Sequence, residues 1–308
     1  MDNTKLIYIM GRGHSGSTLL DVVLGNSKDI ESVGELVSAM SRIEKEICSC
    51  KEKMTRCPYW TSILSNFNNK YSDKSFKSLC FQSVKQGNIK IFFKTLFFKR
   101  KYVKLVDGSF DFFKEVSLIS KKKFIVDSSK EHTRGLLFSR SDRAHLIHIV
   151  RRPDRILSST YFRAINGEQV KFLRFKFQPK NKIALFLYIL TMSVSWSIGN
   201  FLAEITKLVA RNKVLLIRYE DFITQPKDTL IKIQNQFKID LSDLIYKLEQ
   251  KELLYIGHNV GGNRFRFQES FTIEPQKSTQ RKLPSFFKGM TILINLPFML
   301  YYGYNPFN

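Results

Sequence analysis

The chain has 308 residues, a hydrophobic fraction of 43% and a formal net charge of +23 at pH 7. This length and apolar content suffice for one large domain or two small ones with a buried core, and they exclude a disordered chain. So basic a protein attracts nucleotides, acidic glycans and anionic membrane faces, whereas no recognisable nucleic-acid-binding motif accompanies the basic runs.

The first informative segment is the glycine-bearing sequence Gly-Arg-Gly-His-Ser-Gly-Ser-Thr at residues 11–18. It has the G-x-x-x-x-G-x-[ST] spacing of a phosphate-binding P-loop. The apolar run at 6–10 predicts a buried parallel strand before it, and the run at 18–24 has helical periodicity. Backbone N–H groups of the turn and the helix dipole would together bind an anion. Because Ser17 replaces the lysine of ATPases and GTPases, we predict a phosphate-like ligand other than an ATP γ-phosphate.

Four cysteines follow, at positions 48, 50, 57 and 80. We favour reduced, partly buried thiols and assign no metal ligand. The alternative is a zinc site, for which Cys80 is a loose candidate as the fourth ligand of Cys48, Cys50 and Cys57. The N-terminal residues lead directly into the first core strand, so no secretory signal is expected, and a reducing cytosol fits the free thiols.

The remaining elements predict an α/β fold of the P-loop type, in which a parallel sheet is flanked by helices in a single domain over 1–308. Strands are expected at 123–127, 145–150 and 214–219, with helices between them. The Lys- and Phe-rich residues 61–125 predict a basic helical cap insertion over the acceptor side. Loops that bear motifs then lie at the carboxyl ends of the strands, where open α/β sheets bind ligands.

A second candidate phosphate element begins where the apolar strand at 146–150 ends. Arg151 stands at the strand end and Ser159 two turns into the next helix, so a guanidinium fork and a hydroxyl could converge on one phosphate. The alternative is that Arg151, Arg152 and Arg155 form a solvated basic turn.

Three later segments have two interpretations each. Residues 183–202 are as long as a membrane span, but their polar residues favour a buried helix. Residues 286–304 predict a core-packing helix, with a membrane-surface helix as the alternative. The basic run at 277–282 is either a solvated face or part of a nucleotide site.

With these segments in view, the chain resembles the sulfotransferases that use 3′-phosphoadenosine 5′-phosphosulfate (PAPS), in a layout similar to bacterial and tyrosylprotein-type members. Residues 14–19 resemble the 5′-phosphosulfate loop of that family, and Arg151 with Ser159 resembles its 3′-phosphate element. The resemblance runs from residue 6 to about 267, and its further matches are residues 33–36, 126–130, 216–222, His258 and 261–266. One departure is His14, which stands where the family carries Lys or Arg.

The resemblance implies sulfuryl transfer from PAPS to a hydroxyl or amine of a glycan, lipid-linked or small-molecule acceptor, without a required metal. It implies Glu35 as general base, with Lys130 and a protonated His14 neutralising the leaving phosphate. Asp127 is expected to order its own turn, and His132 is a reserve acid–base candidate. The predicted donor-binding residues are Arg12, Gly13, His14, Ser15, Gly16, Ser17, Thr18, Arg151, Ser159, Arg264, Arg266, Arg281 and Lys282.

Two other functions stay open at this point. A P-loop small-molecule kinase would need a Mg²⁺-binding acid such as Asp127, but ATP has no 3′-phosphate for Arg151 and Ser159. A non-catalytic, membrane-peripheral nucleotide-binding protein would have no use for Glu35 and Lys130. We therefore expect a cytoplasmic enzyme, with peripheral contact to an anionic membrane as a further option.

Overall fold

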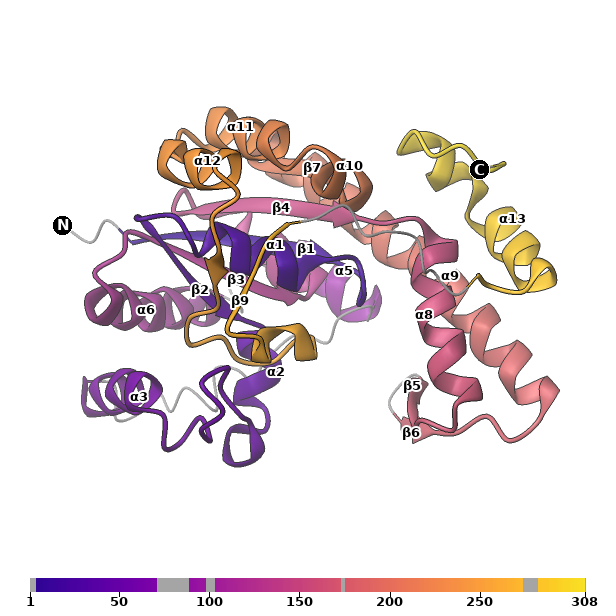
Figure 1. Ribbon diagram of the computed structural model, residues 1–308, viewed down its shortest axis with the longest axis horizontal. Coiled ribbons are helices and arrows are strands. Elements are labelled where there is room, and N and C mark those ends of the chain that lie inside the picture. Colours follow the sequence, from indigo (N-terminus) through magenta and orange to yellow (C-terminus); the bar gives the residue numbers. More distant parts are fainter. Residues whose placement is uncertain (1–3, 71–88, 98–102, 173–174, 274–281, 308) are drawn as a thin grey trace.

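Figure 1 shows the computed structural model of the protein, which describes residues 4–70, 89–97, 103–172, 175–273 and 282–307. Its centre is a parallel five-stranded sheet in the order β2-β3-β1-β4-β7. The strands are β1 (Lys5–Gly11), β2 (Ile30–Gly34), β3 (Phe124–Lys130), β4 (Ala144–Val150) and β7 (Val214–Arg218). All five carboxyl ends therefore lie at one edge, and the predicted α/β fold with a parallel sheet is confirmed.

Successive residues of the central strand face opposite sides of the sheet. Leu6, Tyr8 and Met10 of β1 belong to one buried cluster, and Ile7 and Ile9 belong to another. This alternation follows from the two-residue period of a strand. The sheet is thus buried on both faces, as an all-parallel sheet must be.

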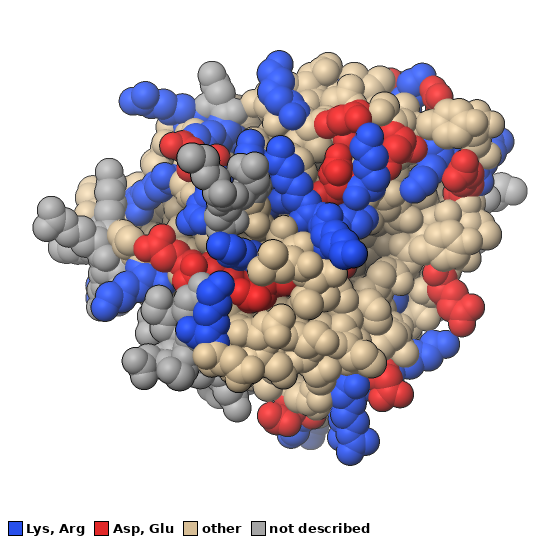
Figure 2. Space-filling model, turned by 90° about the vertical axis from the view of Figure 1, so that its left-hand side faces the viewer, with Lys and Arg blue, Asp and Glu red and all other residues tan. Residues whose placement is uncertain are grey.

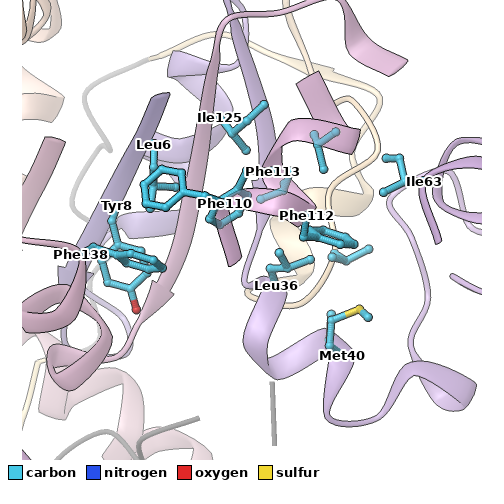
Figure 3. Packing of buried hydrophobic residues seen from close by; sticks show 14 of the residues in the cluster. Leu6, Tyr8, Leu36, Met40, Ile63, Phe110, Phe112, Phe113, Ile125 and Phe138 are labelled. Carbon is cyan, nitrogen blue, oxygen red and sulfur yellow. The ribbon is translucent and has the colours of Figure 1, made fainter. Parts of the chain in front are cut away.

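Helices α2 (Leu36–Met40), α3 (Pro58–Lys70), α6 (Val103–Ser120) and α7 (His132–Phe138) contribute to the first cluster. Figure 3 shows phenylalanine side chains of α6 packed beside Leu6 and Tyr8 of β1 and Phe138 of α7. The second cluster includes side chains of α1 (Ser17–Leu24), α10 (Tyr219–Thr224), α11 (Pro226–Phe237) and α12 (Ser242–Glu249). Helices on both faces complete the predicted layers.

A third cluster joins α8 (Pro153–Ile165), α9 (Lys182–Ala210) and α13 (Ser285–Tyr301), which lie beyond one side of the sheet in Figure 1. Among the described helices, α9 is long and apolar enough to cross a membrane by length and composition. Its inner side nevertheless contacts α7, α8, α13, β1 and β7. In addition, the ring Nε2 of His148 on β4 lies 3.0 Å from Asn200 Oδ1 of α9. These contacts support the predicted core helix, while Leu187 and Leu208 on its other side are exposed.

The segment predicted as a basic cap lies partly in the layers of the sheet. Helix α6 contacts β2 and β3, and α5 (Ile89–Phe97) packs against α7. Residues 71–88 and 98–102 lie outside the described residues, so a covering role over an acceptor stays a prediction. Figure 2, which views the side bearing α3 and α6, shows Lys and Arg spread over the face with Asp and Glu among them. The positive charge is therefore not gathered into one patch on this face.

Short elements complete the chain. Two small antiparallel ribbons are formed by β5 (Val170–Phe172) with β6 (Phe175–Phe177) and by β8 (Leu254–Tyr255) with β9 (Ser270–Phe271). Within the described residues, the 3₁₀ turns are η1 (Ile43–Lys45), η3 (Arg211–Lys213) and η4 (Arg264–Phe267). Gly34, the last residue of β2, forms an isolated parallel bridge with Val260, which brings the late part of the chain to the edge that carries the predicted motifs.

Candidate functional site

The predicted anion-binding loop connects β1 to α1 at the carboxyl edge of the sheet. Gly16 precedes the first residue of α1 and has a φ of 91°, a conformation that glycine adopts without steric cost. Within the loop, Ser15 Oγ donates a hydrogen bond to the Arg12 carbonyl at 2.7 Å. Ser15, Ser17 and Thr18 are buried at the start of the helix. The loop thus presents the amino end of α1, the position at which helices bind anions.

Two distant segments hold this loop from one side. A Cβ at Gly16 would overlap the ring of Tyr219, which follows β7. The Arg151 guanidinium lies over the same ring at 4.2 Å, and its Nη1 donates to the His14 carbonyl at 3.1 Å. The end of β4 therefore meets the loop, as the sequence predicts for Arg151. Ser159 lies in α8 with an exposed side chain.

On the other side of the loop, Lys130 and Glu35 form an ion pair at the ends of the neighbouring strands β3 and β2. Their side chains are 10% and 17% exposed, so the pair is largely removed from water. Lys130 has a φ of 67°, a left-handed conformation that is uncommon for a residue with a Cβ. Strained backbone recurs at active sites, and here it occurs at the residue whose side chain meets the Glu35 carboxylate.

The late segment after β8 places Glu35 beside the loop. The Glu35 backbone N–H donates to the Val260 carbonyl at 2.7 Å. A Cβ at Gly262 would lie 3.1 Å from Thr18 Oγ1 and 3.2 Å from Glu35 Oε1. The base predicted from the resemblance is consequently close to the first turn of α1.

The ionisation of His14 depends on its burial and on the cations around it. Burial, together with the neighbouring cations Arg163, Lys130 and Arg151, lowers the pKa of His14 to about 4. The imidazole is therefore neutral at pH 7 in the protein alone, and its protonation with a donor bound stays a prediction. An anion bound among these cations would act in the opposite direction.

Of the four late basic residues predicted to bind the donor, Arg266 makes contacts within the protein. Its guanidinium is buried, and Nη2 donates to Glu46 Oε1 at 2.9 Å and to the Ile47 carbonyl at 3.2 Å. Arg266 therefore fixes the late segment to residues 46–47, and a contact between Arg266 and the donor stays a prediction. Arg264 and Lys282 are exposed, and Arg281 lies outside the described residues.

The two subsidiary predictions concern Asp127 and His132. Asp127 Oδ1 accepts hydrogen bonds from the backbone N–H and the hydroxyl of Ser129, so it orders its own turn as predicted. His132, the first residue of α7, is buried against Gly199 of α9. A Cβ at Gly199 would lie 3.2 Å from the Nε2 atom of His132. Burial lowers the pKa of His132 to about 3, so it is a poor reserve for acid–base work.

A cavity of about 140 Å³ opens beside the loop, and sequence reasoning did not find it. Its walls come from the loop (Arg12, Gly13, His14), α8 (Ile156, Thr160, Arg163), β5 (Val170) and α9 (Tyr188, Met192, Trp196). The pattern of polar and apolar residues predicts α8 and α9 as helices but does not show which of their turns face the loop. None of the lining residues belongs to the predicted cap.

A buried carboxylate behind the loop also escaped prediction. Asp21 of α1 accepts hydrogen bonds from Ser32 Oγ of β2 and Ser128 Oγ of β3, both at 2.6 Å. Asn259 donates in turn to Ser32 Oγ. Complete burial raises the pKa of Asp21 to about 7. This network fastens the loop helix to the two strands whose ends carry Glu35 and Lys130.

Comparison with known proteins identifies relatives of this arrangement. A model of the sulfotransferase family matches residues 7–243. The structure is similar to the sulfotransferase domain of the Synechococcus PCC 7002 olefin synthase, with 17% identity, a TM-score of 0.51, and coverage of 97% of this chain and 96% of that chain. It is also similar to the sulfotransferase domain from the curacin biosynthetic pathway, with 17% identity, a TM-score of 0.52, and coverage of 98% of both chains. No curated protein matches the sequence. At this identity the two structures show a common fold.

Proposed function

Because the chain belongs to the sulfotransferase family, we propose that it transfers a sulfuryl group from PAPS to a hydroxyl or amine of a glycan, lipid-linked or small-molecule acceptor. The observation that supports this proposal most directly is that the ends of β2, β3 and β4 lie around the loop between β1 and α1. Arg151 braces the loop through the His14 carbonyl, while the Glu35–Lys130 pair lies across from it. The arrangement provides an anion site, a second cation for a 3′-phosphate, and a carboxylate within one edge of the sheet.

The donor would be held by the loop through its sulfate end and by α8 through its 3′ end. Ser15, Ser17 and Thr18 lie at the amino end of α1, where hydroxyls and N–H groups stabilise an anion. Arg151 and Ser159 would take the 3′-phosphate, since a guanidinium and a hydroxyl both donate to phosphate oxygens.

Transfer requires one bond to form and one to break at sulfur. The acceptor oxygen or nitrogen attacks in line, its bond to sulfur forms, and the bond between sulfur and the bridging phosphate oxygen breaks, which releases adenosine 3′,5′-bisphosphate. Glu35 would take the acceptor proton, and Lys130 would stabilise the charge that develops on the bridging oxygen. The ion pair of Lys130 with Glu35 supports this proposal, because it would hold both groups near the loop before the donor binds.

The cavity beside the loop is the place we propose for the acceptor. It combines the aromatic rings of Tyr188 and Trp196 with the cationic side chains of Arg12 and Arg163. Rings bind the apolar faces of sugars or other rings, while guanidinium groups pair with carboxylates or phosphates. An acceptor that carries a ring and a negative charge fits this lining.

The decisive test measures nucleotide binding by calorimetry. Adenosine 3′,5′-bisphosphate should bind more tightly than AMP, because a charge-assisted bond to the 3′-phosphate is worth roughly 1.5–3 kcal/mol, or about ten- to a hundredfold in affinity. Arg151→Ala should remove most of this preference. Ser159→Ala should reduce it without disturbing the loop, since Ser159 is exposed, whereas Arg151 also braces His14.

The control is Arg211→Ala, which removes an exposed arginine. Arg211 lies just before the amino end of β7, whereas the site lies at the carboxyl ends of the strands. It should keep the wild-type preference. Equal affinity of the wild type for the bisphosphate and AMP would refute the PAPS proposal. Tighter binding of ATP that requires Mg²⁺ would favour a kinase, and nucleotide binding without transfer to any acceptor would favour a non-catalytic protein.

A further inference from the structure

Three cysteines and a histidine from distant parts of the chain lie close together in the structure. The sulfur atoms of Cys48, Cys50 and Cys57 and a ring nitrogen of His258 all lie within 4.8 Å of one another. Cys50 Sγ lies 3.6 Å from Cys57 Sγ, and His258 Nδ1 lies 3.6 Å from Cys48 Sγ and 3.3 Å from Cys57 Sγ. Four ligand atoms thus occupy one small volume, although about 200 residues separate His258 from the cysteines.

The three separations of 3.3–3.6 Å are close to the edges of a metal-centred tetrahedron, and no pair of the four atoms is more than 4.8 Å apart. With Zn–S bonds of about 2.3 Å and Zn–N bonds of about 2.0–2.1 Å, tetrahedral angles give sulfur–sulfur edges of about 3.8 Å and sulfur–nitrogen edges of about 3.6 Å. A disulfide needs its sulfurs about 2.05 Å apart, much closer than the 3.6 Å between Cys50 and Cys57. The spacing therefore suits a shared ion better than a bridge.

The backbone around the cysteines forms a tight turn that directs their side chains inward. Ile47 and Lys53 form an antiparallel bridge, and the Cys48 N–H donates to the Glu52 carbonyl at 2.8 Å. Lys51 at the tip has a φ of 72°. Cys57 follows this turn and immediately precedes Pro58, the first residue of α3.

The histidine is held in place by aromatic neighbours from the same helix. The Tyr59 ring stacks on the His258 ring at 4.7 Å with an interplanar angle of 9°. Trp60 Nε1 donates to the His258 carbonyl at 2.9 Å. Because neighbouring groups fix the ring, Nδ1 already faces the sulfurs, as outer contacts do for metal-bound histidines.

The four ligands indicate which metal the site would bind and what role that metal would have. We propose that Cys48, Cys50, Cys57 and His258 bind one zinc ion as a structural site. Three thiolates and an imidazole are ligands typical of Zn²⁺, and four protein ligands close the coordination sphere, which leaves no position for a reactant. Binding releases the three thiol protons to solvent and leaves the sulfurs as thiolates.

The site would join the two segments that support Glu35. On one side of it, Ser49 exchanges hydrogen bonds with Asn259: the Ser49 N–H donates to the Asn259 carbonyl and the Asn259 N–H donates to Ser49 Oγ, both at 2.9 Å. The next residue, Val260, accepts the Glu35 N–H. A zinc ion would therefore stabilise the late segment in the position that the described structure shows.

The test measures metal content directly. The full chain is expressed with zinc in the medium and purified without a metal-affinity step. Its zinc content is then measured by inductively coupled plasma mass spectrometry. About one zinc ion per chain is expected, and replacement by Co²⁺ should give the visible d–d bands of a tetrahedral thiolate site. Cys50→Ser should lose most of the bound metal. This variant is preferred because Cys50 is exposed, whereas Cys48 and Cys57 are buried.

Cys80→Ser is the matched control, since Cys80 is the ligand that spacing alone suggested. It should keep its zinc, and a chelator should lower the midpoint of thermal unfolding of this control and of the wild type but not of Cys50→Ser. Wild-type protein without zinc and without cobalt bands would overturn the proposal, as would a Cys50–Cys57 disulfide in freshly purified protein or a loss of zinc from Cys80→Ser. None of these readouts depends on sulfuryl transfer, so the two proposals fail separately.

Discussion

Replacing Gly16 by alanine tests the way in which the loop is held. Gly16 has a φ of 91°, and a Cβ there would lie against Cδ2 and Cε2 of the Tyr219 ring, well inside the ~3.5–4.0 Å of normal carbon contact. The left-handed backbone costs a residue with a Cβ about 1–2 kcal/mol, and overpacking costs about 1–3 kcal/mol more. We therefore expect Gly16→Ala to destabilise the protein by about 2–5 kcal/mol.

The same loop offers a matched control. A Cβ at Gly13 meets nothing within 4 Å, and Gly13 is not among the glycines of positive φ. Gly13→Ala should thus leave the free energy of unfolding unchanged or raise it by about 0.4–1 kcal/mol through the unfolded state. Gly16→Ala combined with Tyr219→Ala should remove the overlap with the ring but keep the backbone strain.

Thermal unfolding of the variants measures the difference. With an unfolding entropy of about 2.1 cal/mol/K per residue, a loss of about 2–5 kcal/mol lowers the midpoint of a chain of this length by about 3–8 °C. Because the Tyr219 ring also stacks with Arg151, Gly16→Ala should weaken nucleotide binding as well. If Gly16→Ala unfolds at the same temperature as Gly13→Ala, the packing of the loop against Tyr219 is not as described.

Three further predictions concern ionisable groups. Glu35→Gln should lower the single-turnover rate of sulfuryl transfer by about 10²–10⁴-fold with little change in PAPS affinity, and an unchanged rate would remove Glu35 from the mechanism. An NMR titration of His14 in the protein alone should have its midpoint near pH 4 and move upward when adenosine 3′,5′-bisphosphate binds; a midpoint near 6.5 would contradict the described burial. The pKa of Asp21 is raised from 3.8 to about 7 by folding, so stability should fall as pH rises from about 4 to 7, by up to about 1.4 kcal/mol per pH unit. Asp21→Asn should abolish that fall in urea unfolding, and the same pH dependence in both proteins would refute it.

The strands that carry the loops could be predicted because their side chains make the signal. The strands β1, β3, β4 and β7 each contain a short, mostly apolar run, as a sheet buried on both faces requires. The edge strand β2 was not predicted, since its sequence Ile-Glu-Ser-Val-Gly is not an apolar run. Its polar side chains find partners elsewhere: Glu31 accepts from the Tyr59 hydroxyl at 2.9 Å, and Ser32 donates to Asp21.

The same holds for the site: contacts that follow from the ends of parallel strands could be predicted, and contacts between residues far apart in the sequence could not. The encounter of Arg151 with the loop follows from the rule that parallel strands end at one edge, and the structure confirms it. The roles of His14 and Arg266 depend on partners that spacing does not reveal. Arg266 pairs with Glu46, 220 residues away, and the cations that lower the pKa of His14 come from β3, the end of β4 and α8. Motif matching places such residues in a list of candidates, but only the fold decides which of them face a ligand.

The late segment at 257–266 matches a family motif that has no obvious chemical role. Its contacts nevertheless affect the site. Val260 bonds to Glu35, Gly262 lies against both Thr18 and Glu35, and Arg266 is anchored by Glu46. Each contact needs a particular property, namely a backbone carbonyl, the absence of a Cβ and a buried guanidinium. A side chain at Gly262 would press on Thr18 Oγ1 and Glu35 Oε1 from a φ of 77°, so even a methyl group there disturbs the proposed base and the loop together. The segment therefore fixes the position of Glu35 relative to the loop, while the reacting groups that we propose come from the strand ends.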